Sequence, residues 1–281
     1  MTSDAEVIRI SQPPRPARGP HHLPLRTLGR SGLKVSALGL TARDLGVVEA
    51  GETGADALIG AALDAGLNFF GTSAGPLAEE RLGRLLKGRR GELVLSIGVR
   101  DVEDGSGDAL VRSLDRALTR LGTDWIDVMN LRVHPHDPRL AEWIDRLVDA
   151  RRAGKIRAIG WSQSTFLAGA MPVDPRIDVL EARLGSRDLT GARALIRKAA
   201  AQGITVVARM AGGAAIPRQS RLAPASSLSR AELWFRHAAD LPGLASILLH
   251  ARRPSELAAC VRWIIRGRLP AEARADLEDS R

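Results

Sequence analysis

The sequence contains no tyrosine and few other aromatic residues, which limits the chemistry that the chain can perform. Its 281 residues include five tryptophans and four phenylalanines, so only 3% of them are aromatic. The chain therefore has no phenol to act as a proton donor, and few side chains on which single-stranded bases could stack. Cys260 is the only cysteine, which excludes an intrachain disulfide and a cysteine metal cluster. We expect it to be a structural thiol in a reducing compartment.

Long apolar runs are also missing. No run approaches about 18 uninterrupted apolar residues, and the N-terminus is charged and proline-rich where a signal peptide would need an apolar core. These features predict a cytoplasmic protein with no membrane partner. The hydrophobic content of 44% is enough for the full core of a single domain.

The net charge of +9 raises the hypothesis of a basic scaffold that binds nucleic acid or an acidic protein. Only four of the 41 basic residues are lysines, and the arginines are spread over most of the predicted helices. A nucleic-acid site would gather these charges into one stripe. We therefore do not expect a nucleic-acid partner.

Short apolar segments alternate with segments of helical spacing along most of the chain. Two short strands around Gly29 to Gly32 predict a hairpin that plugs one end of a barrel. Strand-like segments follow at 37–40, 68–72, 93–97, 126–131, 157–161, 177–184, 205–208 and 244–249. Helical spacing is found at 55–65, 79–87, 108–120, 140–153, 190–201, 229–239 and 254–266, and a shorter helix is expected near residue 166.

Eight strands, each followed by a helix, predict an α/β fold with a parallel sheet closed into a (β/α)8 TIM barrel, preceded by a β-hairpin. A doubly wound open sheet is the alternative, but no GxGxxG motif follows any of the strands. We expect a flexible tail at residues 1–24, the barrel at 25–268 and a charged tail at 269–281. The stretch 210–229 is expected to be a long loop over the barrel mouth, where it could serve as a lid or a partner contact.

Several linked motifs follow one another along the chain. They are RTLGRSGLKVSALGL, GLNFFGTS followed by AEERLG, SLDRALTRLGTDWIDVMNL, AGKIRAIGWSQS and LPGLASILLHARRPSELAA. Together these motifs resemble those of the aldo-keto reductase family. The resemblance covers about residues 25–266. It implies a barrel that binds NADP(H) and reduces aldehydes or ketones through a tyrosine acid, assisted by a lysine, an aspartate and a histidine.

None of these four catalytic residues is found at its matching position. The aspartate is replaced by Gly71, and the tyrosine by Ala74 or, in another register, by Pro76. Gly98 stands where the lysine would end the third strand, and Arg132 where the histidine would end the fourth. A reduced carbonyl oxygen needs a positioned proton donor, so the resemblance without these groups predicts a relaxed or redirected function.

The positions that match the family's cofactor site are mixed. Ser162 matches the serine that holds the carboxamide of nicotinamide, whereas Gln163 replaces an asparagine. Glu181 replaces a neutral glutamine, and Arg209 stands where an aromatic residue stacks on nicotinamide in many members.

The phosphate end of such a cofactor would lie after the last strand. Arg252, Arg253 and Ser255 follow that strand, where a basic pair and a helix N-terminus favour anions. We therefore keep NADP(H) as the suspected cofactor, with nicotinamide placement the weaker part of the match.

Two further groups at the predicted strand ends carry charge. His134 and His136 with Asp137 could form a metal or acid/base cluster, although a loop with prolines also leaves such side chains in water. We expect no metal site. Arg132, pointing into the mouth, would need an anionic partner, for which Glu181 is a candidate.

The leading hypothesis is a barrel of aldo-keto reductase descent that has lost the Asp/Tyr/Lys/His tetrad. Such a pseudoenzyme would bind a ligand or a partner, or perform altered chemistry. The first alternative is an NADPH-dependent oxidoreductase in which His134 replaces the tyrosine as the proton donor. The second is the basic scaffold described above.

Overall fold

The computed structural model describes residues 23–41, 51–72, 75–99, 102, 104–163, 171, 174–184, 189–211 and 228–274. The expectations for residues 1–22, for Ala74, for a helix near 166 and for most of the 210–229 loop lie outside these residues. No helix within them is long and apolar enough to cross a lipid bilayer.

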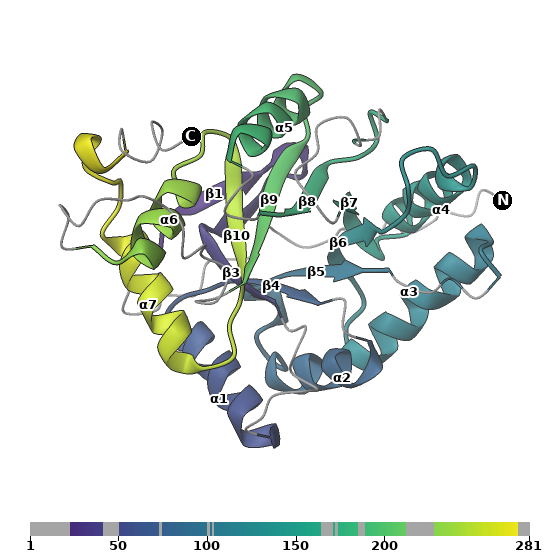
Figure 1. Cartoon of the computed structure of the whole chain (residues 1–281). Helices are drawn as coiled ribbons and strands as arrows, with labels where there is room; N and C mark the ends of the chain where they lie inside the picture. Colours follow the sequence, from purple (N-terminus) through teal and green to yellow (C-terminus); the bar gives the residue numbers. More distant parts are fainter. Residues whose placement is uncertain are drawn as a thin grey trace, which may run out of the picture.

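The predicted parallel barrel is confirmed (Figure 1). Its strands close in the order β10, β3, β4, β5, β6, β7, β8, β9, and every neighbouring pair is parallel. The strands are β3 Leu38–Thr41, β4 Phe69–Thr72, β5 Val94–Gly98, β6 Ile126–Leu131, β7 Ile156–Gln163, β8 Val179–Arg183, β9 Thr205–Ala211 and β10 Leu244–His250. Each contains or overlaps the apolar segment that predicted it.

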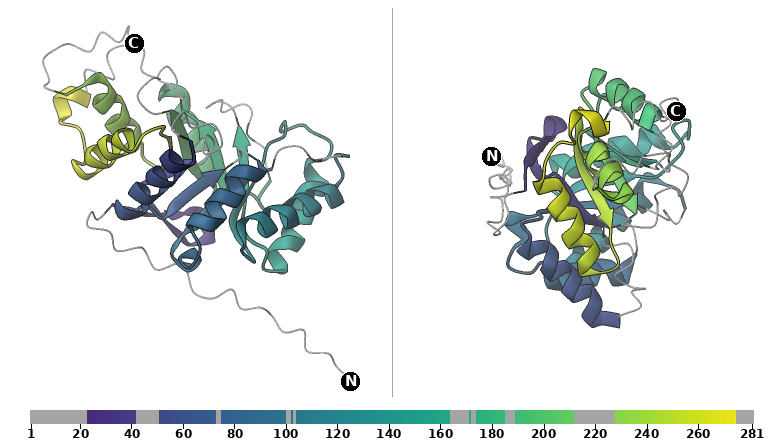
Figure 2. Two further views of the ribbon diagram at one scale, coloured as in Figure 1. Left: turned by 90° about the horizontal axis from the view of Figure 1, so that it is seen from below. Right: turned by 60° about the vertical axis from the view of Figure 1, so that its left-hand side comes forward.

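Helices line the outer wall of the barrel (Figures 1 and 2). They are α1 Gly51–Asp64, α2 Pro76–Leu85, α3 Gly107–Leu121, α4 Leu140–Arg152, α5 Leu189–Ala201, α6 Arg230–Ala239 and α7 Pro254–Ile265. Because β10 pairs with β3, the first and last of these helices, α1 and α7, lie side by side.

Helix α3 shows how local sequence determines such an element. The hydroxyl of Ser106 accepts a hydrogen bond from the Ala109 N–H at 3.1 Å, which caps the helix start. At the other end Gly122 has φ 62°, a left-handed conformation that glycine adopts without strain. The residues spaced three and four apart on its apolar face, Leu110, Leu114, Ala117, Leu118 and Leu121, are all buried.

The N-terminal hairpin closes one end of the barrel, as predicted. Strands β1 Leu25–Leu28 and β2 Leu33–Ser36 pair antiparallel around the 3-10 turn η1, Gly29–Ser31. Three hairpin side chains, Leu28, Leu33 and Val35, join the same buried cluster as the first inward-facing residues of the barrel strands. The hairpin thus seals the end of the barrel at which the parallel strands begin.

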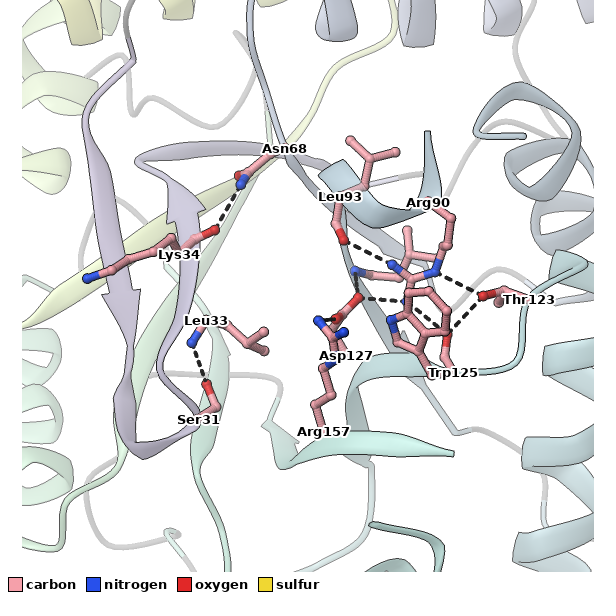
Figure 3. A network of polar contacts seen from close by, with 11 residues as sticks. Ser31, Leu33, Lys34, Asn68, Arg90, Leu93, Thr123, Trp125, Asp127 and Arg157 are labelled. Carbon is pink, nitrogen blue, oxygen red and sulfur yellow. Dashed lines mark hydrogen bonds and ion pairs between the residues drawn. The ribbon is translucent and has the colours of Figure 1, made fainter. Parts of the chain in front are cut away.

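A buried polar network ties β5, β6 and β7 together near the same end (Figure 3). The fully buried carboxylate of Asp127 accepts hydrogen bonds from the Leu95 N–H at 2.9 Å, from Arg90 at 2.8 Å and from Arg157 at 3.0 Å. Both guanidinium groups also lie over the Trp125 ring, at 4.4 and 5.3 Å from its centre. Burial lowers the pKa of Arg90, an effect that the charge of Asp127 opposes.

Packing continues beyond residue 268, where the sequence predicted the barrel to give way to a charged tail. Leu269 is buried against Leu233, and Leu228 and Ala273 pack on this pair. The reason is that apolar side chains interrupt the charged stretch and cover the outer side of α6.

Candidate ligand site at the barrel mouth

The interior of the barrel is apolar near the N-terminal ends of the strands and polar near their C-terminal ends. Side chains alternate along a strand, and Val94, Val128, Val179 and Val207 belong to the interior cluster that the hairpin seals. The residues two positions further along therefore also face the interior, nearer the C-terminal ends of the strands. On β5, β6, β8 and β9 these residues are Ser96, Asn130, Glu181 and Arg209.

An ion pair joins two of these polar residues. Glu181 Oε1 lies 2.9 Å from Arg209 Nε, and only 12% and 16% of the two side chains is exposed. The second oxygen, Oε2, is 3.4 Å from Asn130 Nδ2 and 3.5 Å from Ser96 Oγ, and Asn130 Nδ2 also donates to Ser96 Oγ at 2.7 Å. These four residues, called the polar layer below, therefore form one connected network centred on the Glu181 carboxyl group.

Burial raises the pKa of the Glu181 carboxyl above its ordinary value. The charges of Arg209 and Arg132 act in the opposite direction, and burial is the larger effect. Glu181 therefore keeps its proton to a higher pH than an exposed glutamate does.

Several buried polar atoms at this end of the barrel have no hydrogen-bond partner in the described part of the chain. They are Asn130 Oδ1 and both amide atoms of the Gln163 side chain. Ser162 Oγ makes no hydrogen bond of normal geometry, although it is close enough to Glu181 to lower the pKa of that carboxyl. Buried polar groups are normally paired, so this end of the barrel is suited to a polar ligand.

The structure places three of the four tetrad positions at this end. Gly71 is buried in β4, Gly98 is the half-buried last residue of β5, and Arg132 directly follows β6. A Cβ atom at Gly71 would lie 3.1 Å from Leu248 Cδ1, so a larger side chain requires Leu248 to move. The space beside Gly71 is thus already filled by an apolar residue.

His134, His136 and Asp137 lie together in the loop after β6, with the centres of the two imidazole rings 5.4 Å apart. His134 is exposed, and its Nδ1 accepts a 3.3 Å hydrogen bond from the His136 N–H. Asp137 instead pairs with Arg139 at 2.8 Å, which lowers the pKa of the aspartate to about 2. Among the described residues, no group of three or more histidine, cysteine or acidic side chains is arranged to hold a metal ion.

The basic residues after β10 lie at the start of α7. Arg252, Arg253 and Ser255 are exposed, and Arg253 is the N-cap residue, with no side-chain hydrogen bond to the helix. Glu256 Oε2 accepts a hydrogen bond from the Arg252 N–H at 2.9 Å. This carboxylate takes one backbone donor and adds a negative charge where the sequence predicted an anion site.

The sequence alone did not identify two members of the polar layer, Ser96 and Asn130, as candidate site residues. The available signal is a polar residue at an inward-facing position of an otherwise apolar strand, as in LVLSIG and IDVMNL. The charge of Arg132, the expected partner, acts on Glu181, and Arg209 forms an ion pair with the same carboxyl group. Arg209 reaches Glu181 because β9, the strand that follows β8 in the barrel, carries it on the same inner face.

A closed barrel of eight parallel strands surrounded by helices is the architecture of TIM-barrel proteins. Within that class, this chain belongs to the aldo/keto reductase family, whose sequence profile matches residues 48–266. Helices α1 to α7 and strands β4 to β10 lie in the matched range.

Named relatives match this chain over shorter segments. The chain is 34% identical over 150 residues to L-galactose dehydrogenase of Arabidopsis thaliana, which is 48% of this chain and 47% of that enzyme. It is 36% identical over 163 residues to 6-dehydroglucose reductase of Novosphingobium aromaticivorans, or 50% of this chain and 51% of the relative. The chain thus spans about half the length of each of these relatives.

Solved structures match over a longer range. A protein of Pseudomonas aeruginosa assigned to the aldo-keto reductases superposes with a TM-score of 0.71 and 28% identity, covering 89% of this chain and 98% of its own. An aldo-keto reductase from Bacillus halodurans has a TM-score of 0.75 at 22% identity, covering 92% of this chain and 96% of its own, which shows a shared fold.

Proposed function

We propose that this member of the family binds a small polar ligand at the mouth of its barrel and does not reduce carbonyl compounds by the family's Asp/Tyr/Lys/His mechanism. The observation that carries the proposal is the buried layer around the Glu181–Arg209 ion pair in a chain without tyrosine. The layer offers hydrogen bonds and charge to a ligand. It contains no phenol to protonate a nascent alkoxide.

The surroundings of the replaced residues support this proposal. Gly71 and Gly98 have no side chain to donate a proton, and Leu248 occupies the space beside Gly71. Arg132 has a guanidinium in place of an imidazole, and a guanidinium does not release its proton near neutral pH. An ordinary reductase site would need changes at several of these positions together.

NADP(H), the cofactor that the family implies, fits one part of the structure and not another. Ser162 and Gln163 have buried polar atoms suited to a carboxamide, and Arg252 with Arg253 suits a phosphate. The Glu181–Arg209 ion pair does not suit the uncharged dihydronicotinamide ring of NADPH, which would cover both charged groups without forming hydrogen bonds to them. We therefore propose weak dinucleotide binding that does not lead to hydride transfer.

The relatives suggest the chemical nature of the ligand. Their names refer to L-galactose, to 6-dehydroglucose and, for a reductase of a Corynebacterium strain that is 32% identical over 121 residues, to 2,5-diketo-D-gluconic acid. We propose that a sugar or sugar-derived molecule binds here. Its hydroxyl groups would satisfy polar groups of the kind found in the barrel mouth.

Steady-state and stopped-flow measurements of NADPH oxidation test the proposal. The protein is mixed with NADPH and a panel of aldehydes, sugars and quinones, with an active family member as the positive control. We expect oxidation at the background rate of a sample without protein. Enzymes commonly turn over at about 1 to 1000 per second, so sustained consumption well above background with any substrate would refute the proposal.

The second candidate is a reductase with a different proton donor, for which we propose Glu181 in place of His134. His134 is exposed, whereas Glu181 lies in the mouth, where burial raises the pKa of its carboxyl and so favours the protonated form more than in an exposed glutamate. In this case Glu181→Gln would abolish turnover but retain NADPH binding, as measured by fluorescence titration. Absence of NADPH binding at high micromolar concentrations would eliminate the candidate.

A further inference from the structure

The Arg209 guanidinium is held along one side and open along another. Its Nε lies 2.9 Å from Glu181 Oε1, and its Nη2 donates to the Gln163 carbonyl oxygen at 2.7 Å. A guanidinium has five N–H donors, of which the Nη2 hydrogen bond uses one, while the Nε–H lies close to Glu181 without the alignment of a hydrogen bond. Among the described residues Nη1 has no partner, and 16% of the side chain is exposed. A bound molecule can therefore reach the open edge without displacing either existing contact.

The charge around Arg209 favours an anion. Its carboxylate partner, Glu181, is enclosed by β5, β6, β7 and β9, from which Ser96, Asn130, Ser162 and the positive charges of Arg132 and Arg209 act on it. Burial raises the pKa of this carboxyl, so its negative charge is less favoured than that of an exposed glutamate. Two guanidinium groups, those of Arg132 and Arg209, act on this one carboxyl group, so positive charge is in excess at the barrel mouth.

We propose that the open edge of Arg209 binds the carboxylate of a small ligand, such as a sugar acid, and that Glu181 is the positioning residue that fixes the guanidinium. This inference rests on the proposed function, because it assumes that the barrel mouth holds the ligand. A planar guanidinium edge matches a carboxylate with two parallel hydrogen bonds. One such edge suits a singly charged group better than a phosphate, which has more charge and more acceptors to satisfy.

Isothermal titration calorimetry with three probes tests this assignment. The probes are D-gluconate, inorganic phosphate and sorbitol, the last having the six-carbon hydroxylated chain without the carboxylate, all at the same ionic strength. We expect gluconate to bind at least tenfold more tightly than sorbitol and more tightly than phosphate. Equal binding of gluconate and sorbitol, tighter binding of phosphate, or no gluconate binding at tens of millimolar would each overturn the proposal.

Variants locate the carboxylate contact. Arg209→Gln should weaken gluconate binding at least tenfold, because it removes a charge-assisted bidentate contact. Arg209→Lys keeps the charge next to Glu181 but lacks the planar edge, so it should weaken binding by about tenfold in a protein that remains folded. The matched control is Arg183→Gln, because Arg183 is exposed and lies opposite Arg209 in the pairing of β8 with β9. Its gluconate affinity should change by less than about twofold, and a loss as large as that of Arg209→Gln would overturn the assignment.

The pH dependence separates positioning from a structural role of Glu181. Gluconate affinity should fall as pH rises through the titration of Glu181, because the deprotonated carboxylate repels the anion. In Glu181→Gln, whose amide oxygen can still hold the guanidinium, this slope should vanish, with affinity close to that of the unmodified protein at low pH. If gluconate affinity still fell with pH in Glu181→Gln as in the unmodified protein, Glu181 would not be the group that acts on the bound anion through Arg209. Turnover of a carbonyl compound would refute the proposed function while leaving these affinities intact, so the two failures are distinguishable.

Discussion

Replacing Asp127 by asparagine should destabilise the barrel more than any exposed charge replacement. The carboxylate is fully buried and accepts from Arg90, Arg157 and the Leu95 N–H (Figure 3). Asparagine has one acceptor oxygen, so its amide N–H2 would face at least one of these donors. Removing the charged partner of a buried pair costs about 3–5 kcal/mol. Because 16% of Arg90 and 11% of Arg157 is exposed, the lower end of this range is expected.

Urea unfolding followed by far-UV circular dichroism measures this loss without relying on Trp125, which lies within the network. With an m-value of about 3 kcal/mol per molar, a loss of about 3 kcal/mol lowers the midpoint by about 1 M. Asp149→Asn is the matched control, because Asp149 is 63% exposed and pairs with Arg152, which is 77% exposed. Such pairs contribute at most about 1 kcal/mol. If both variants lost the same stability, the network would not have the importance assigned to it.

Three further changes have defined outcomes. Gly160→Ala should lower the free energy of unfolding by about 1–3 kcal/mol, because the new Cβ atom would collide with Asn130 Oδ1. The control Gly60→Ala, on α1, places its Cβ atom in open space and should not destabilise the protein, and urea unfolding midpoints compare the two variants. Burial raises the pKa of Cys260 from 9.0 to about 12, so iodoacetamide should label the native protein at least about a thousandfold more slowly than the unfolded chain. Because the pKa of Glu181 is raised, the native protein retains a proton that the unfolded chain releases above about pH 4.5. The free energy of unfolding should therefore fall as pH rises through the raised pKa of Glu181. Urea midpoints of Glu181→Gln should lack this pH dependence.

The barrel could be predicted because its signals are local. Apolar runs such as Ile126–Leu131 coincide with strands, and Ser106 and Gly122 mark the ends of α3 through their own backbone and side-chain chemistry. The hairpin is likewise a short-range feature, with η1 between two strands. Such elements depend on residues within a few positions of one another, and the alternation of their type then defines the closed sheet.

The arrangement of the polar layer could not be predicted in the same way. Glu181 and Arg209 are 28 positions apart in the chain and meet only through the pairing of β8 with β9. Sequence motifs favoured Arg132 as the partner of Glu181, because both occupy positions known from the family. Ser96 and Asn130 occupy none of those positions, and their inward orientation follows from strand register, which is a property of the assembled barrel.

A single-turnover experiment tests the central claim most directly. Protein is mixed in excess over NADPH with a saturating aldehyde or reducible sugar, and both the loss of NADPH and the appearance of alcohol are followed. An excess of protein detects even one slow hydride transfer per site, so low turnover cannot conceal activity. We predict that NADPH persists as long as in a sample without protein, and that no alcohol forms. Stoichiometric conversion to alcohol would contradict the account.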